Sequence, residues 1–429
     1  MYIYDRKFSG APSLLEEQPI TSQPAGRTSY YPGRVISGFG EASTALASKV
    51  LWPTKFRWGD KTFSTNIQSS FERALHTVRN DTSFSHLPDV RTVPIAIMAL
   101  DPSGARPIAG QREFEMFYSG SLLKVAAMYA AYQLRVAVNE LAPTLSATVN
   151  TTDKVFQTIR NTFNKQIDES VPRILLAGGI TLTMRVPKYP TIFHAAKIGG
   201  VWRLKFNDAG GANSFASHLR RMIVGSHNES AGFCIRALGY SWINGVLQAA
   251  GFLRFDFPKS EGIWLAGDYE QQKTVTIPSV NDEAVKQATT CFDMARLFAL
   301  LHDKKLVKNF AHFATALSGN DEMLNLLKDA VDDPAAPSLL KRVPHSFVVR
   351  QSKIGVGELK AGGSCLDTNR DRCVYAEAAI LQHPPTSRKF VVVWQNLTYF
   401  RAHPSWWRDG LNRIVAVIQK TMDDYVLRN

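Results

Sequence analysis

SLLKVAAMYAAYQL, residues 121–134, predicts an apolar helix whose first turn carries a serine and a lysine three residues apart. At that spacing Ser121 and Lys124 lie on one helix face, about one turn from each other. A serine hydroxyl is a poor nucleophile until a base takes its proton, and a buried lysine with a lowered pKa is such a base. The helix N-terminus adds positive potential where an oxyanion would form. The same spacing also occurs by chance, as a helix cap followed by a solvated lysine, so the flanking sequence has to decide.

The flanking sequence predicts strands at both ends of the chain and helices in the middle. Residues 93–101 predict a buried strand and residues 106–117 its hairpin partner, and the helix follows at once. Near the C-terminus the predicted strands and closing helix are 346–356, 373–381, 389–397 and 406–426. These patterns indicate an α+β fold with one antiparallel sheet built from both ends of the chain, flanked by helices and interrupted by an inserted all-helical domain.

The same patterns predict the domain organisation. Residues 1–60 are rich in Ser, Pro, Gly and Tyr without a clear period, which is typical of an N-terminal extension. Residues 61–145 and 340–429 form the predicted sheet domain, and residues 146–339 form the predicted insertion, which is mainly helical.

Two further short motifs follow the first one. Ser226-His-Asn228 precedes a predicted helix, where serine and asparagine also occur as ordinary caps. Lys353-Ile-Gly355 lies on a predicted strand, where an edge lysine is also common. Taken singly, each motif is compatible with a purely structural role.

In this order and setting, the three motifs resemble those of the serine β-lactamase and penicillin-binding protein superfamily, and class A β-lactamases most closely. The resemblance implies that Ser121 attacks an amide or β-lactam carbonyl, that Lys124 accepts its proton, and that Ser226 passes a proton to the leaving nitrogen. Two positions depart from the class A pattern. His227 stands where class A enzymes usually have Asp, and Ile354 replaces a threonine whose hydroxyl contacts the substrate.

The resemblance also assigns substrate binding. It implies that Asn228 orients substrate, that Lys353 holds a carboxylate, and that Gly355 lets substrate approach the strand edge. The backbone N–H groups of Ser121 and Val356 would form the oxyanion hole. Lys360-Ala361-Gly362 is a competing register for the third motif; we prefer Lys353 because apolar strand residues flank it.

Deacylation separates the enzymes of this superfamily. A hydrolase needs a base for the attacking water, and Glu261 lies in a predicted loop at a plausible distance after Asn228. The Leu-Asn that follows this glutamate in class A enzymes is missing, and a surface carboxylate paired with Lys259 is the alternative. We therefore expect a β-lactamase-like serine hydrolase. The alternatives are a D-alanyl-D-alanine carboxypeptidase or esterase on the same fold, or a non-hydrolysing penicillin-binding sensor or pseudoenzyme.

Composition limits the partners. The chain has 429 residues and a net charge of +13, which favours an anionic partner or serves only solubility. No run of basic residues indicates a nucleic-acid tail, and no apolar run is long enough for a membrane span. The expected partner is a small-molecule or peptidoglycan-like carboxylate, with neither a cofactor nor a metal, because the histidines lack ligand spacing.

Compartment and redox state stay open at this stage. The family implies a periplasmic or secreted protein, yet the first residues do not read as a signal peptide, so either the protein stays in the cytoplasm or its true start lies upstream of Met1. Cys365 and Cys373 flank a short stretch between predicted strands and are either a hairpin disulfide or two free thiols.

Overall fold

The structure is a computed structural model of the whole chain. It describes residues 65–84, 93–102, 106–169, 182–256, 259–267, 276–308, 318–359, 373–399 and 406–429. The predicted N-terminal extension, residues 1–60, and the alternative motif beginning at Lys360 lie outside the described residues.

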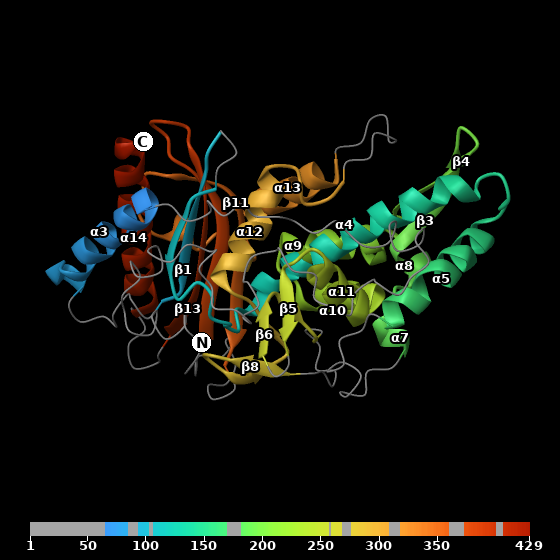
Figure 1. Ribbon diagram of the computed structural model, residues 1–429, viewed down its shortest axis with the longest axis horizontal. Coiled ribbons are helices and arrows are strands. Elements are labelled where there is room, and N and C mark those ends of the chain that lie inside the picture. Colours follow the sequence, from blue (N-terminus) through green and yellow to red (C-terminus); the bar gives the residue numbers. More distant parts are fainter. Residues whose placement is uncertain are drawn as a thin grey trace, which may run out of the picture.

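A five-stranded antiparallel sheet is assembled from the two ends of the chain, in the order β11-β12-β13-β1-β2 (Figure 1). Its strands are β1 (Ile95–Leu100), β2 (Ile108–Gln111), β11 (Val348–Glu358), β12 (Cys373–Gln382) and β13 (Lys389–Tyr399). The central pairing is between β1 and β13, in the register Ile97↔Val392, so the first strand of the chain joins the last. This confirms the predicted α+β fold with its antiparallel sheet.

One face of the sheet is covered by two helices from opposite ends of the chain, α3 (Thr65–Arg79) and α14 (Trp406–Arg428) (Figure 1). The apolar side chains Ile67, Phe71 and Val78 recur at helical spacing on α3 and are buried against the sheet and α14. Burial of each such large side chain contributes roughly 1.5–3 kcal/mol. The pattern read from residues 65–80 is therefore the reason this helix packs where it does.

The other face carries α12 (Cys291–His302) and the helices that hold the site. The long α4 (Lys124–Leu141) runs away from the sheet through the helical region, as Figure 1 shows. The remaining helices of this region are α5 (Thr152–Glu169), α7 (Leu182–Arg185), α8 (Tyr189–Ile192), α9 (Phe215–Ile223), α10 (Asn228–Leu238), α11 (Tyr240–Ala249) and α13 (Gly319–Asp329). Between α10 and α11, Gly239 has a φ of +81°, which ends one helix and starts the next.

Short two-stranded pieces interrupt the helices, and the sequence patterns did not predict them. They are β3 (Phe193–Ile198) with β4 (Val201–Phe206), β5 (Leu253–Asp256) with β6 (Lys259–Gly262), β7 (Trp264–Leu265) with β10 (Gln287–Ala288), and β8 (Ile277–Ser279) with β9 (Glu283–Val285). The first of these hairpins packs its alternating apolar residues under α4 and α5.

The cysteines differ in state. Cys373 takes part in a disulfide, which excludes the free-thiol alternative at this position, and Cys365 lies outside the described residues. Cys234 and Cys291 are buried free thiols, and burial raises the pKa of Cys234.

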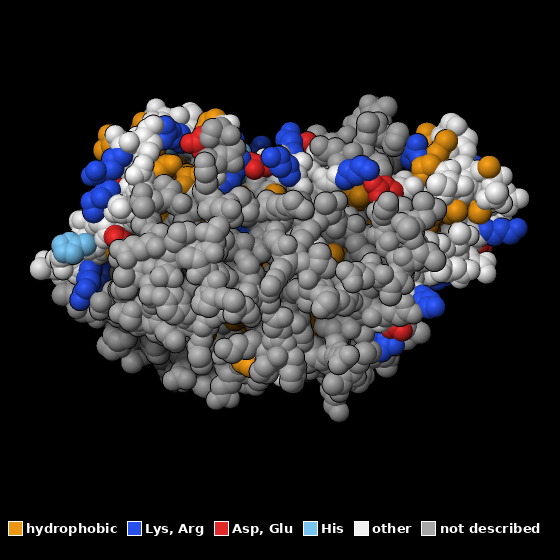
Figure 2. Space-filling view, viewed as in Figure 1, with side chains coloured by type: hydrophobic (Ala, Val, Ile, Leu, Met, Phe, Trp, Pro, Cys, Tyr) orange, Lys and Arg blue, Asp and Glu red, His pale blue; other side chains and the backbone are white. Residues whose placement is uncertain are grey.

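The described surface mixes charges of both signs. Figure 2 shows Lys and Arg side chains along the upper rim with Asp and Glu among them. Exposed pairs include Arg220 with Asp329 and Lys341 with Asp332. None of the helices in the described ranges is long and apolar enough to cross a membrane.

Candidate active site

Ser121 sits in a single 3-10 turn, η5 (Gly120–Leu123), that runs directly into α4. Lys124 is the first residue of α4 and is fully buried, while Ser121 is 8% exposed. The predicted pair therefore lies at a helix start, as the spacing required, with only the serine reachable from outside.

Two glycines let this turn meet strand β11 backbone to backbone. Gly120 has a φ of +53°, and a Cβ there would lie 2.5 Å from the backbone of Val356. A Cβ on Gly355 would lie 2.0 Å from the carbonyl oxygen of Ser119. The sequence analysis expected Gly355 to let substrate approach the strand edge. In the structure the space beside Gly355 is filled by the backbone just before the turn that carries Ser121. This close packing brings the backbone of Val356 next to the turn that carries Ser121.

The second motif is both a helix cap and part of the site. His227 is the N-cap of α10, and its Nδ1 accepts a hydrogen bond from the backbone N–H of Ser230 at 3.3 Å. Ser226, just before it, has a φ of +55°, which is strained for a residue with a side chain. The cap and the left-handed turn together fix the directions of Ser226 and Asn228.

The three motifs meet at the hydroxyl of Ser226. The Nζ of Lys353 donates to Ser226 Oγ at 2.7 Å. The Nζ of Lys124 lies 3.5 Å from the same oxygen, donates to Asn228 Oδ1 at 2.7 Å, and also donates to the carbonyl oxygen of Ser226. One hydroxyl thus bridges two buried amines that lie more than 200 residues apart in the chain.

The electrostatics of the two amines favour proton transfer. Burial lowers the pKa of Lys124 well below its ordinary value, and the charge of Lys353 lowers it further. Burial also lowers the pKa of Lys353, to about 7, against the opposing pull of Asp333 and Glu377. A lysine that is neutral near pH 7 can accept a proton, and a charged neighbour strengthens the bridging hydroxyl as a donor.

Glu261 is the predicted residue whose setting differs most from expectation. It lies on strand β6, opposite Arg254 of β5, and not in a loop. The next residue, Gly262, donates its N–H to the sulfur of Met116 at 3.2 Å, so β6 lies against the segment that leads to Ser121.

The sequence analysis did not predict two residues that form hydrogen bonds with the backbone of the segment carrying Ser121. Asn281 accepts from the N–H of Tyr118 at 2.9 Å and donates to its carbonyl oxygen at 3.0 Å. Gln287 donates to the carbonyl oxygen of Gly120 at 3.4 Å. These residues lie more than 160 positions beyond the turn, and no local pattern marks them, so only the folded arrangement reveals them.

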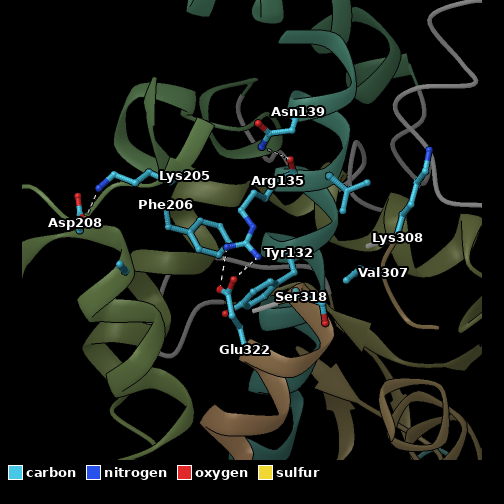
Figure 3. A pocket seen from close by; sticks show the side chains of 13 residues that line it. Tyr132, Arg135, Asn139, Lys205, Phe206, Asp208, Val307, Lys308, Ser318 and Glu322 are labelled. Carbon is cyan, nitrogen blue, oxygen red and sulfur yellow. Dashed lines mark hydrogen bonds and ion pairs between the residues drawn. The ribbon is translucent and has the colours of Figure 1, made fainter. Parts of the chain in front are cut away.

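A separate cavity of about 330 Å³ lies further along α4, between β4 and α13 (Figure 3). In it the guanidinium of Arg135 lies against the rings of both Tyr132 and Phe206, 4.7 Å from each ring centre, and the two rings contact each other edge to face with their centres 5.0 Å apart. Both of its terminal nitrogens donate to the carboxylate of Glu322 at 2.9 Å. None of the predicted site residues lines this cavity. Among the described residues no cluster of His, Cys, Asp and Glu is suited to hold a metal ion.

The sheet, its covering helices and the mainly helical region between its strands form the α+β arrangement that the sequence analysis predicted, in keeping with the resemblance to serine β-lactamases and penicillin-binding proteins. No family model matches the chain, and no curated protein matches it. Solved structures do match. A β-lactamase from Chitinophaga pinensis is 14% identical over 85% of this chain and 100% of its own, with a TM-score of 0.43.

Two further matches are of the same kind. The TLA-3 extended-spectrum β-lactamase is 14% identical over 84% of this chain and 99% of its own, with a TM-score of 0.45. A class A β-lactamase representative from Bacteroides cellulosilyticus is 10% identical over 84% and 99%, with a TM-score of 0.43. At these identities and scores the likenesses say nothing about the activity or substrate of this chain.

Proposed function

We propose that this protein is a serine acyl-enzyme hydrolase that acts on an amide or β-lactam bond next to a carboxylate. The observation that carries the proposal is the hydroxyl of Ser226 held between the amines of Lys124 and Lys353. A helical serine beside a buried amine supplies the nucleophile and its base, and a second serine between two amines supplies a route for the proton.

The proposed reaction has two stages. Neutral Lys124 takes the proton of Ser121 as its Oγ attacks the carbonyl, and the N–H groups of Ser121 and Val356 stabilise the oxyanion. The proton then passes through Ser226 to the leaving nitrogen as the C–N bond breaks. Lys353, in its charged form, holds the substrate carboxylate, and Asn228 orients both Lys124 and the substrate.

The direct test is covalent labelling with a fluorescent penicillin. Ser121→Ala should abolish the adduct seen by intact-mass spectrometry. Ser119→Ala is the matched control, because that serine lies two residues earlier, is buried, and spends its hydroxyl on the carbonyl of Phe117 at 3.2 Å. Undiminished labelling of the Ser121 variant would refute the proposed nucleophile.

Deacylation is assigned to Glu261 as the base for water. Its support is a half-buried carboxylate on a strand that lies against the segment leading to Ser121. Glu261→Gln should leave acylation fast and trap the adduct, whereas Glu229→Gln, on an exposed side chain of α10, should not. Turnover that survives in Glu261→Gln removes this residue from the mechanism. A wild-type adduct that lasts for hours favours the penicillin-binding or sensor alternative.

A further inference from the structure

Two carboxylates approach Lys353 from different directions. Asp333 lies in the turn after α13, with its Oδ1 3.8 Å from the position of a Cβ on Gly225, the residue before Ser226. Glu377 lies on β12 directly across from Ile354, the neighbour of Lys353 in β11. Neither residue belongs to a motif, and neither is needed to assemble the amines around Ser226.

Glu377 is fully buried beneath β11 and is surrounded by donors. Its Oε1 accepts from Ser338 Oγ and Ser352 Oγ, both at 2.5 Å, and its Oε2 accepts from the backbone N–H of Leu340 at 2.9 Å. Burial raises the pKa of Glu377, and these hydrogen bonds oppose that rise. Three donors and an acceptor-only role match the ionised carboxylate. In its ionised form Glu377 places a buried negative charge across from the neighbour of Lys353 in the ladder.

The proposed reaction needs unequal charges on its two amines. Two buried ammonium groups around one hydroxyl repel each other, so they titrate as a coupled pair in which one proton leaves first. If Lys353 loses the proton, it can no longer bind the substrate carboxylate as a cation. If Lys124 loses the proton, its neutral amine can accept the proton of Ser121. Among the described residues, the groups that act on Lys353 are Lys124 from α4, Ser226 from the turn before α10, Asp333 from the turn after α13 and, from the opposite face of the sheet, Glu377 of β12.

We propose that Asp333 and Glu377 act as positioning residues that keep the positive charge on Lys353 and so leave Lys124 as the neutral base. This inference rests on the proposed function and adds to it a reason for the division of labour between the two lysines. Asp333 acts from the side of Gly225, and Glu377 acts from the far face of the sheet. Both raise the pKa of Lys353 against its burial, and charged Lys353 in turn lowers the pKa of Lys124.

The test is the pH dependence of penicillin acylation in wild-type protein, Glu377→Gln and Asp333→Asn. The rate should rise as Lys124 loses its proton and fall as Lys353 loses its own. Removing either acid should move the alkaline midpoint to lower pH by roughly one unit, the low end of the effect of a neighbouring opposite charge. The acidic midpoint should stay or rise, so the active range narrows. Glutamine can still bond Ser338 and Ser352, because hydroxyls both donate and accept.

Asp332→Asn is the matched control, because Asp332 is the neighbour of Asp333 but is 74% exposed and paired with Lys341. It removes the same charge and should leave both midpoints in place. A parallel loss of rate at every pH in Glu377→Gln would show a merely structural role and overturn the inference. So would an equal shift in Asp332→Asn, which would indicate only the overall charge of the protein.

A second measurement does not depend on activity. In protein labelled with ¹³C at the lysine Cε, the two signals are assigned with Lys124→Arg and Lys353→Arg variants and followed through a pH titration. Lys124 should lose its proton at lower pH than Lys353, and Glu377→Gln should reduce that separation. The reverse order of titration would overturn the inference even in a protein that labels well. Absence of labelling with the expected order would refute the proposed function alone.

Discussion

Two basic side chains on helix α4 have partners of opposite kinds. At its start, Lys124 donates to an amide oxygen, a backbone carbonyl and a hydroxyl. Eleven residues and about 16 Å further on, Arg135 donates to a carboxylate and lies against two aromatic rings. A carboxylate partner fixes the charge of a cation, whereas neutral acceptors leave an amine that burial readily strips of its proton. The same helix thus carries an amine that burial tends to neutralise and, eleven residues further on, a guanidinium held in an ion pair.

The largest effect that tests this contrast is on acylation. Lys124→Ala should slow labelling of Ser121 by about 100-fold or more, because a general base is lost. Arg135→Ala should leave the labelling rate of the folded molecules unchanged, because its partners lie outside the site. Stopped-flow fluorescence with a fluorescent penicillin measures both rates. An equal loss in the two variants would mean that the helix acts as one unit and that the contrast is wrong.

Backbone contacts sharpen the contrast. Gly355→Ala in β11 places a Cβ 2.0 Å from the carbonyl oxygen of Ser119, so the turn that carries Ser121 and β11 must separate. We expect a loss of about 2 kcal/mol in the free energy of unfolding and slow labelling of the folded fraction. Gly319→Ala in α13, next to Arg135, is the control. Its Cβ would meet only side chains, the nearest being Val307 Cγ2 at 3.0 Å, so denaturant unfolding should change far less.

For substitutions at Arg135 the expected effect is on stability alone. Arg135→Met keeps an apolar side chain against Tyr132 and Phe206 but removes the hydrogen bonds to Glu322. The free energy of unfolding should fall by about 1–2 kcal/mol. Arg220→Met removes a comparable pair with Asp329 in which both side chains are exposed, and should change stability by less than about 0.5 kcal/mol. Urea midpoints that fall equally in both variants would mean that burial adds nothing to the Arg135 pair.

The sequence predicted the sheet and its covering helices because their apolar residues repeat at the period of the element. It missed the β3–β4 hairpin, although Gly199-Gly200 lies between two alternating apolar runs and is a recognised hairpin signal. The helical reading of the surrounding residues hid that signal. The sequence placed a helix cap in the right motif but on the wrong residue: serine and asparagine are the usual capping types, whereas His227 caps α10 in the structure.

For the site, the sequence predicted the residues that belong to short motifs and missed those that act across the fold. Lys124, Ser226, Asn228 and Lys353 are brought together by hydrogen bonds, and Ser121 lies in the turn that leads into Lys124. Their catalytic and binding roles stay predictions. Asn281, Asp333 and Glu377 reach the site from segments 55 or more residues beyond Ser226 and 160 or more beyond Ser121, and no spacing rule links them. Which charges surround a buried lysine is a property of tertiary packing, so it has to be read from the structure.

The last effect expected is spread over a pH range: it is the pH dependence of stability. In the unfolded chain Lys353 keeps its proton up to about pH 10.4, while in the folded protein its pKa is about 7. Between pH 7 and 9 the unfolded state therefore binds more protons than the folded state, and the free energy of unfolding rises with pH. One such group adds up to about 1.4 kcal/mol per pH unit. The buried tyrosines do not interfere in this window, because burial raises the pKa of Tyr118 to about 12 and raises that of Tyr129 as well.

Lys353→Met should flatten this slope by about 1 kcal/mol per pH unit, because methionine does not titrate. Arg135→Met should leave the slope unchanged, because a guanidinium stays protonated in the folded and unfolded states throughout this range. Urea unfolding at pH 7, 8 and 9 compares the three proteins. A Lys353→Met protein with the wild-type slope would show that this lysine keeps its proton in the folded state. In that case Lys353 would keep its charge despite its burial next to Lys124, and the contrast with Arg135 would be lost.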